Sequence, residues 1–176
     1  MNLPNKLTFL RILLVPVFVI LMYLGQEFRI IATIVFCLAS FTDFLDGYLA
    51  RKNNLVTNFG KFADPLADKI LVCSAIIIFC EMGDIPAWAV IIIIAREFAI
   101  TGFRIIAASM NITIAAGSLG KIKTATQLVA VILMLIGLPI LYKTGLILFY
   151  ISLFFTIISA VDYMIKNKEV LDLENM

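Results

Sequence analysis

The stretch that decides the fold consists of two segments separated by eight residues, DFLDGYLAR (residues 43–51) and GKFADPLAD (residues 60–68). Their aspartates lie inside or at the edge of long apolar segments, where an ionised carboxylate is expensive and seldom kept without a role. On helices, spacings of three and four residues place two side chains on one face. Two such helices joined by a short loop would pack antiparallel and bring the four carboxylates together. These are Asp43, Asp46, Asp64 and Asp68.

Four carboxylates with no matching cations beside them repel one another unless divalent metal ions lie between them. Oxygen-only ligation suits hard ions such as Mg²⁺ or Mn²⁺. The residues alone therefore fit a metal-dependent enzyme or a cation transporter, because transporters also use intramembrane aspartates. Gly47 and Ala50 share a helical stripe with Asp43 and leave space beside it, either for a neighbouring helix or for a planar ligand.

The composition predicts an all-α integral membrane protein. Of the 176 residues, 62% are hydrophobic and only 15% are charged, and the mean hydropathy is +1.07. An ordinary globular domain is roughly half apolar and about a quarter charged. The length suits a single domain over residues 1–176, and the net charge of +2 with no basic run gives no sign of a nucleic-acid partner.

Histidine is absent from the chain. This excludes histidine-based catalytic triads, histidine-ligated zinc and imidazole general bases, so proton transfer must use carboxylate, Lys, Tyr or Cys. The three cysteines, Cys37, Cys73 and Cys80, are scattered through apolar segments without metal-type spacing. We interpret them as small buried hydrophobic residues.

Apolar runs along the chain predict six transmembrane helices, each close to the ~20 residues that cross a bilayer. A polar segment over residues 1–6 is expected at the membrane interface, and the first helix follows it to about residue 23 and is retained rather than cleaved. The next four runs cover about 30–50, 61–81, 86–107 and 122–141. A break at residues 142–145 is expected before the sixth run, which ends near residue 165.

Loop charges predict the orientation. With a cytoplasmic N-terminus, the outer side carries only Arg29 and Lys143, as the positive-inside rule requires. Both termini and the aspartate cluster then lie on the cytoplasmic side of the plasma membrane. The inner side collects the remaining loop cations: Lys6, Arg11, Arg51, Lys52, Lys61, Lys121, Lys123, Lys166 and Lys168.

The full pattern is Asp-x-x-Asp-Gly-x-x-Ala-Arg, eight residues, Gly, three residues, Asp, three residues, Asp. It resembles the signature of the CDP-alcohol phosphotransferases, with every fixed position filled. Residues 4–11, 95–104 and 120–124 resemble in particular the branch that makes phosphatidylglycerophosphate. The resemblance covers nearly the whole chain, and the family's fold also has six transmembrane helices.

The resemblance implies transfer of a phosphatidyl group from CDP-diacylglycerol to an alcohol, with release of CMP. It implies that the four aspartates surround two divalent cations, Mg²⁺ or Mn²⁺, and that Asp68 is the general base. It also implies a homodimer among membrane lipids. The residues expected at the CDP-lipid site are Asn5, Thr8, Gly47, Ala50, Arg51 and Gly60.

The acceptor of this branch is glycerol 3-phosphate, whose phosphate needs cations. Arg96 lies well inside its apolar run, and pairing with Glu97 explains only part of that, since neighbouring residues on a helix diverge by about 100°. The two lysines among the candidates fit interfacial anchors equally well. Another acceptor, such as serine, inositol phosphate or a second lipid, and a divalent-cation transporter are the alternatives. The candidates for the acceptor phosphate are Arg96, Arg104, Lys121 and Lys123.

Overall fold

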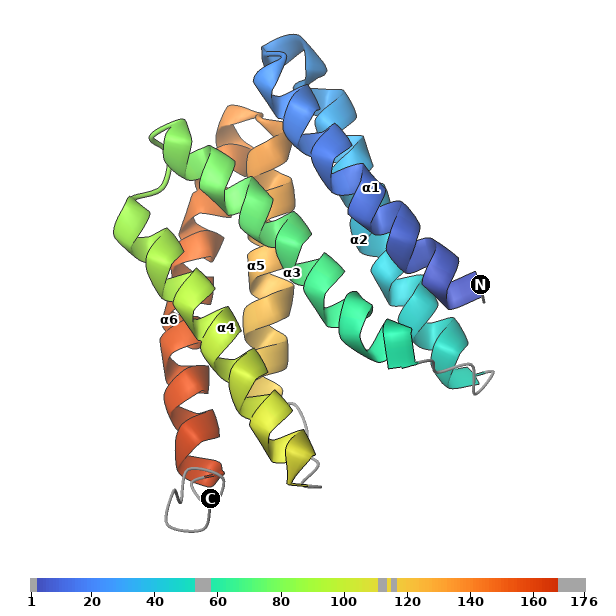
Figure 1. Cartoon of the computed structure of the whole chain (residues 1–176). Coiled ribbons are helices and arrows are strands. Elements are labelled where there is room, and N and C mark those ends of the chain that lie inside the picture. Colours follow the sequence, from blue (N-terminus) through green and yellow to red (C-terminus); the bar gives the residue numbers. More distant parts are fainter. Residues whose placement is uncertain (1–2, 53–57, 111–113, 115–116, 168–176) are drawn as a thin grey trace.

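The computed structural model describes residues 3–52, 58–110, 114 and 117–167; within its helices, the side chains of residues 3–7, 43–52, 58–66, 68 and 109 lie outside the description. The described chain forms six α-helices and one 3-10 turn (Figure 1). In chain order these are α1 (Leu3–Tyr23), η1 (Gln26–Phe28), α2 (Arg29–Lys52), α3 (Asn58–Glu81), α4 (Ala87–Ser109), α5 (Ser118–Ile136) and α6 (Pro139–Lys166).

The helices alternate in direction and form a bundle (Figure 1). The α1–α2, α3–α4 and α5–α6 turns lie toward one end, the upper end in Figure 1. The start of α1, the end of α2, the start of α3 and the end of α6 lie toward the other. The most extensive helix pairs are α5 with α6 and α1 with α2. The expected number of helical segments is therefore present in the described chain.

Two helix boundaries differ from the sequence predictions. The first helix begins at Leu3, so the segment predicted as interfacial is continuous with it. The predicted break at residues 142–145 is wrong, because these residues lie inside α6. The break falls at Gly137, whose φ of 77° ends α5 in the left-handed region, and Pro139 opens α6 where a missing N–H costs little.

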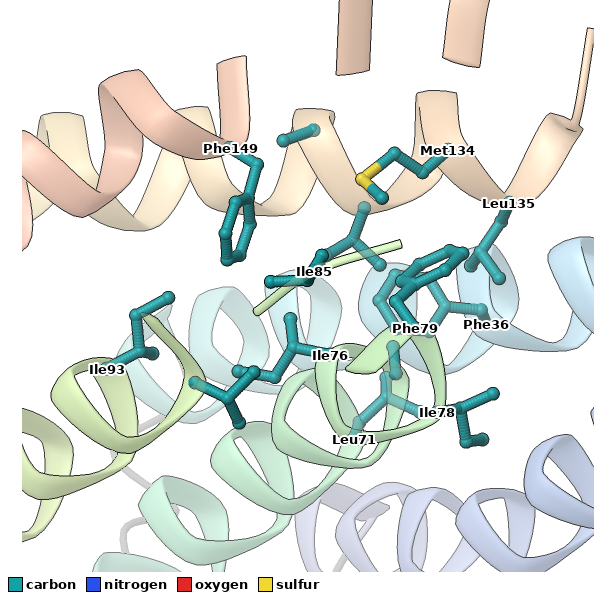
Figure 2. Close-up of a cluster of buried hydrophobic side chains, with 14 of the residues drawn as sticks. Phe36, Leu71, Ile76, Ile78, Phe79, Ile85, Ile93, Met134, Leu135 and Phe149 are labelled. Carbon is teal, nitrogen blue, oxygen red and sulfur yellow. The ribbon is translucent and has the colours of Figure 1, made fainter. Parts of the chain in front are cut away.

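The main core is a cluster of buried aromatic and aliphatic side chains contributed by all six α-helices. Figure 2 shows Phe36, Phe79, Met134 and Phe149 converging from four of these helices. The rings of Phe18 and Phe36 lie 5.4 Å apart between centroids, which joins α1 to α2. The core fixes the helices that surround the cavity described below.

The outer surface of the bundle is also apolar. Phe98 is 69% exposed and Ile140 is 80% exposed, and large aliphatic side chains face outward along every helix. A helix that is apolar all round belongs in a large core or a membrane. Among the described residues, α5 and α6 are long and apolar enough to cross a bilayer. The 23-residue α4 lies between these two helices in length but carries Arg96, Glu97 and Arg104, and these charged side chains line the cavity described below.

Candidate active site

A cavity of about 780 Å³ lies between α3, α4, α5 and α6. It is on the side of the bundle where α5 begins and α6 ends, because its lining includes Gly117 and Tyr163. Its apolar wall comes from Val72, Ile93 and Leu128, while charged side chains enter it from all four helices. A polar cavity in an apolar bundle is the expected place for chemistry.

All four cations that the sequence proposes for the acceptor phosphate line this one cavity. Arg96 and Arg104 come from α4, and Lys121 and Lys123 come from the first turns of α5. Lys123 is buried, with only 4% of its side chain exposed, and so does not extend to the surface as an interfacial anchor does. The structure therefore brings the four together, while their role stays a prediction.

The carboxylate of Glu97 lies among these cations. Glu97 Oε1 is 2.5 Å from Lys123 Nζ and accepts a hydrogen bond of 3.0 Å from Arg96 Nη1. Its other oxygen, Oε2, is 3.6 Å from Lys69 Nζ. The pairing of Arg96 with Glu97 occurs although the two are chain neighbours, because the long arginine side chain reaches around the helix.

Two further contacts fix the arginines against α6. Arg96 Nη2 donates a hydrogen bond of 3.0 Å to Ser159 Oγ. Arg104 Nε donates one of 3.2 Å to the Tyr163 hydroxyl, and its guanidinium carbon lies 5.6 Å from the centre of the Tyr163 ring. Both arginines are thus held at the cavity wall by α6.

The aspartate segment lies directly before the cavity in the chain. Asp43 and Asp46 are in the last turns of α2, and Asp64 and Asp68 are in the first turns of α3. Lys69, the next residue after Asp68, lines the cavity. The side chains of the four aspartates lie outside the described residues, and no group of three metal-binding side chains occurs among those described.

The residues expected at the CDP-lipid site fall mostly in the same segment. Thr8 is fully buried in α1, one turn before the fully buried Arg11. Arg11 Nε donates a hydrogen bond of 3.3 Å to the carbonyl oxygen of Ala39 on α2, so Arg11 is buried against α2 and is not the loop cation that the sequence suggests. The side chains outside the described residues are those of Asn5, Gly47, Ala50, Arg51 and Gly60.

Sequence reasoning assigned no site role to several polar residues of the cavity, among them Lys69, Glu97 and Ser159. The signal for the first two was present, since each is a charged residue within an apolar segment. Ser159 gives no such signal, because serines occur widely in transmembrane helices. It is identified only by its contact with Arg96.

A family model described as CDP-alcohol phosphatidyltransferase matches residues 1–158. The chain belongs to this family. A Bacillus subtilis relative, named CDP-diacylglycerol–glycerol-3-phosphate 3-phosphatidyltransferase, is 46% identical over 99% of both chains. A Rickettsia bellii protein of the same name is 40% identical over 92% of this chain and 93% of its own. A Mycobacterium tuberculosis protein named probable phosphatidylglycerophosphate synthase is 36% identical over 94% of this chain and 81% of its own.

The cavity of this CDP-alcohol phosphatidyltransferase suits an anionic ligand. Five cationic residues line it, Lys69, Arg96, Arg104, Lys121 and Lys123, against the two acidic residues Glu97 and Asp162. In a cavity with apolar walls this excess of positive charge attracts an anion strongly, because charges are poorly screened there.

Proposed function

We propose that this chain transfers a phosphatidyl group from CDP-diacylglycerol to glycerol 3-phosphate, forming phosphatidylglycerophosphate and releasing CMP. The relatives from Bacillus subtilis and Rickettsia bellii carry that activity in their names and align with nearly the whole chain. The domain boundaries of 1–176 and a homodimeric assembly belong to the same proposal and rest on the resemblance to the family.

The observation that carries the acceptor assignment is the positive cavity. Serine has no net charge, so an enzyme for serine has no need of five cations around its acceptor. Glycerol 3-phosphate brings a phosphate dianion, and guanidinium groups bind phosphate oxygens with charge-assisted hydrogen bonds. The proposed ligands of this phosphate are Arg96, Arg104, Lys121 and Lys123. Contacts with Ser159 and Tyr163 of α6 hold the two arginines at the cavity wall.

The membrane arrangement we propose has six spans, with both termini and the cavity on the cytoplasmic side. The apolar outer surface supports lipid contact on all helices. The end of the bundle where α2 ends, α5 begins and α6 ends carries Lys52, Lys121 and Lys166 in the terminal turns of these helices, which supports a cytoplasmic assignment of that end. A soluble acceptor and a bilayer-dissolved CDP-lipid could both reach a cavity at this interface.

The donor set of the aspartate segment fits divalent metal. Four carboxylates are supplied by two helices that pack against each other and whose ends lie side by side (Figure 1), and hard ions such as Mg²⁺ and Mn²⁺ prefer such oxygen ligands. We propose that Asp43, Asp46, Asp64 and Asp68 hold two such ions. When bound, they would neutralise charge that develops on the diphosphate.

The remaining chemistry falls to residues of the chain. The cations of the cavity hold the phosphate of the acceptor so that its hydroxyl faces the aspartate segment. Asp68 takes the hydroxyl proton as that oxygen attacks the phosphorus bearing the diacylglycerol. The bond from this phosphorus to the oxygen of CMP breaks, and CMP leaves. The proposed contacts of the CDP-lipid are Asn5, Thr8, Gly47, Ala50, Arg51 and Gly60.

The test is a transfer assay with protein purified in detergent, using CDP-diacylglycerol, Mg²⁺ and radiolabelled glycerol 3-phosphate beside labelled serine and myo-inositol phosphate. We expect label in the lipid fraction only from glycerol 3-phosphate, with equimolar CMP. Asp68→Asn removes the base while keeping the size of the side chain, and we expect at least a ~100-fold loss of turnover, as for other positioned bases.

Glu27→Asn is the control, because Glu27 is exposed in η1 at the opposite end of the bundle. It should retain full activity. Transfer to serine or inositol phosphate instead would preserve the family and overturn the acceptor assignment. Full activity of Asp68→Asn would remove the proposed base, and release of no CMP by folded, metal-loaded protein would favour a transporter.

A further inference from the structure

Glu97 connects three cations from three helices within the cavity. Lys69 comes from α3, Arg96 from α4 and Lys123 from α5, and each has an atom within 4.0 Å of the Glu97 carboxylate. Glu97 itself is 14% exposed. The proposed reaction gives this carboxylate no direct role, and its negative charge, taken alone, would weaken the binding of an anionic acceptor.

The contact with Lys123 spans the cavity between α4 and α5. Among the described residues these two helices make few close backbone approaches, whereas α4 packs on α3 and α6. Lys123 is 4% exposed, and its ammonium group lies 2.5 Å from Glu97 Oε1. A buried ammonium without a counter-charge is expensive, so without Glu97 this side chain would move or lose its proton.

The same carboxylate fixes the other two cations. Arg96 is held on one side by Glu97 and on the other by Ser159 of α6. Lys69 is held by Glu97 and by the hydroxyl of Thr101, which itself donates a hydrogen bond of 2.7 Å to the carbonyl oxygen of Glu97. Long cationic side chains lose much rotamer freedom when ordered, so holding them in advance removes that cost from ligand binding.

We propose that Glu97 is a positioning residue for the acceptor, which holds Lys69, Arg96 and Lys123 in the arrangement that receives the acceptor's phosphate. The inference rests on the proposed function. It opposes a simple electrostatic expectation: if Glu97 only lowered the positive charge of the cavity, its neutralisation would tighten phosphate binding. If it positions the cations, its neutralisation weakens that binding.

The experiment uses full-length purified protein and compares Glu97→Gln, Glu97→Asp, Lys123→Met and the double variant Glu97→Gln/Lys123→Met. For Glu97→Gln we expect KM for glycerol 3-phosphate to rise about tenfold, the effect of one charge-assisted hydrogen bond. KM for CDP-diacylglycerol should change less than about twofold, since the carboxylate is assigned to the acceptor side. Glu97→Asp keeps the charge and should recover part of the loss.

The double variant separates positioning from independent action. If Glu97 acts partly through Lys123, then Glu97→Gln should raise KM by a smaller factor once Lys123 is Met, although its effect through Lys69 and Arg96 persists, so the two losses should be less than additive. Direct binding of glycerol 3-phosphate without CDP-lipid, measured by calorimetry, should follow the same pattern. Glu27→Gln, a carboxylate-to-amide change outside the cavity, is the matched control and should leave both KM values unchanged.

Unchanged or lower KM for glycerol 3-phosphate in Glu97→Gln, or losses that add in the double variant, would overturn this inference while the wild-type activity stands. Failure of the wild-type protein itself to use glycerol 3-phosphate would instead overturn the proposed function, and the inference with it. If Glu97→Gln does not fold, a wild-type KM in a folded Glu97→Asp would also contradict positioning, because the shortened side chain withdraws the carboxylate from the cations.

Discussion

Arg29 binds the carboxyl end of α5 from the start of α2. Its Nε and Nη2 donate hydrogen bonds of 3.1 and 2.8 Å to the carbonyl oxygens of Leu135 and Met134. These carbonyls have no partner within their own helix, and the helix dipole favours a cation at this end. The guanidinium carbon also lies 5.9 Å from the centre of the Tyr142 ring. One side chain thus joins α2, α5 and α6.

Replacing Arg29 with Met should destabilise the protein by about 1–3 kcal/mol, because hydrogen bonds from a charged donor are lost and two carbonyls are left unsatisfied. Arg29→Lys should lose less, since an ammonium can satisfy one carbonyl but lacks the planar fork. Thermal unfolding in detergent measures both. Lys143→Met is the control, because Lys143 is exposed at the same end, and equal melting temperatures for all variants would contradict the capping role.

For single residues, the sequence predicts which charged side chains are unusual better than it predicts which residues they contact. The sequence places Arg29 between two apolar runs, but its partners on α5 lie 105 and 106 positions away along the chain. Arg11 shows the same limit, since a cation counted among the loops is buried against Ala39. The four cations proposed for the acceptor phosphate could be singled out because charged residues in or beside apolar segments are few, and the structure places all four at one cavity.

The α5–α6 pair includes a close approach at Gly145. A Cβ atom at Gly145 would lie 2.8 Å from the carbonyl oxygen of Ala130 and 2.8 Å from Met134 Cγ. Small residues allow transmembrane helices to approach closely in this way, and the approach provides van der Waals contact where lipid gives no hydrophobic drive.

Gly145→Ala should therefore destabilise the protein by about 1–3 kcal/mol, the usual cost of overpacking, because the backbone of α5 must shift. Gly102→Ala is a matched control in α4, since nothing lies within 4 Å of its added Cβ. It should be neutral or raise stability by up to ~1 kcal/mol through helix propensity. In thermal unfolding, Gly145→Ala should lower the melting temperature whereas Gly102→Ala should leave it unchanged or raise it. Equal melting temperatures for the two variants would contradict the close approach.

The α5–α6 boundary shows why helix ends are harder to predict than helices. The hydrophobic pattern continues across residues 136–141, so only the sequence Gly137-Leu138-Pro139 marks the turn. The polar residues at 142–145 suggested a break, but Gly145 serves packing and Tyr142 meets Arg29. A left-handed glycine followed by proline is the stronger local signal, because each acts through the backbone itself.

For the whole molecule, the sequence predicted the family, which the comparisons confirm, and the number of helical segments in the described chain. The aspartate signature carried the family because fixed spacings of charged residues and glycines in apolar helices are rare. The full lining of the cavity could not be predicted, because it requires α3, α4, α5 and α6 to be placed relative to one another. The six spans and the orientation stay predictions that need a membrane experiment.

Helix α5 offers the sharpest test of orientation, because exposed residues flank it on both sides. Leu138 is 58% exposed in the α5–α6 turn, and Gly117 is exposed just before Ser118. The 19 residues of α5 rise by about 28 Å, close to the ~30 Å thickness of the bilayer core. Single cysteines at these two positions, in an active protein without its three native cysteines, should therefore report opposite sides of the membrane.

In intact cells, a membrane-impermeant maleimide should label Leu138→Cys, whereas Gly117→Cys should react only after permeabilisation. The reason is the distribution of charge, since Lys121 and Lys123 lie four and six residues after Gly117 and cations are retained in the cytoplasm. The reverse pattern would place the cavity on the outer face, away from a cytoplasmic acceptor. Labelling of both variants in intact cells would mean that α5 does not span, and a six-span bundle would then be excluded.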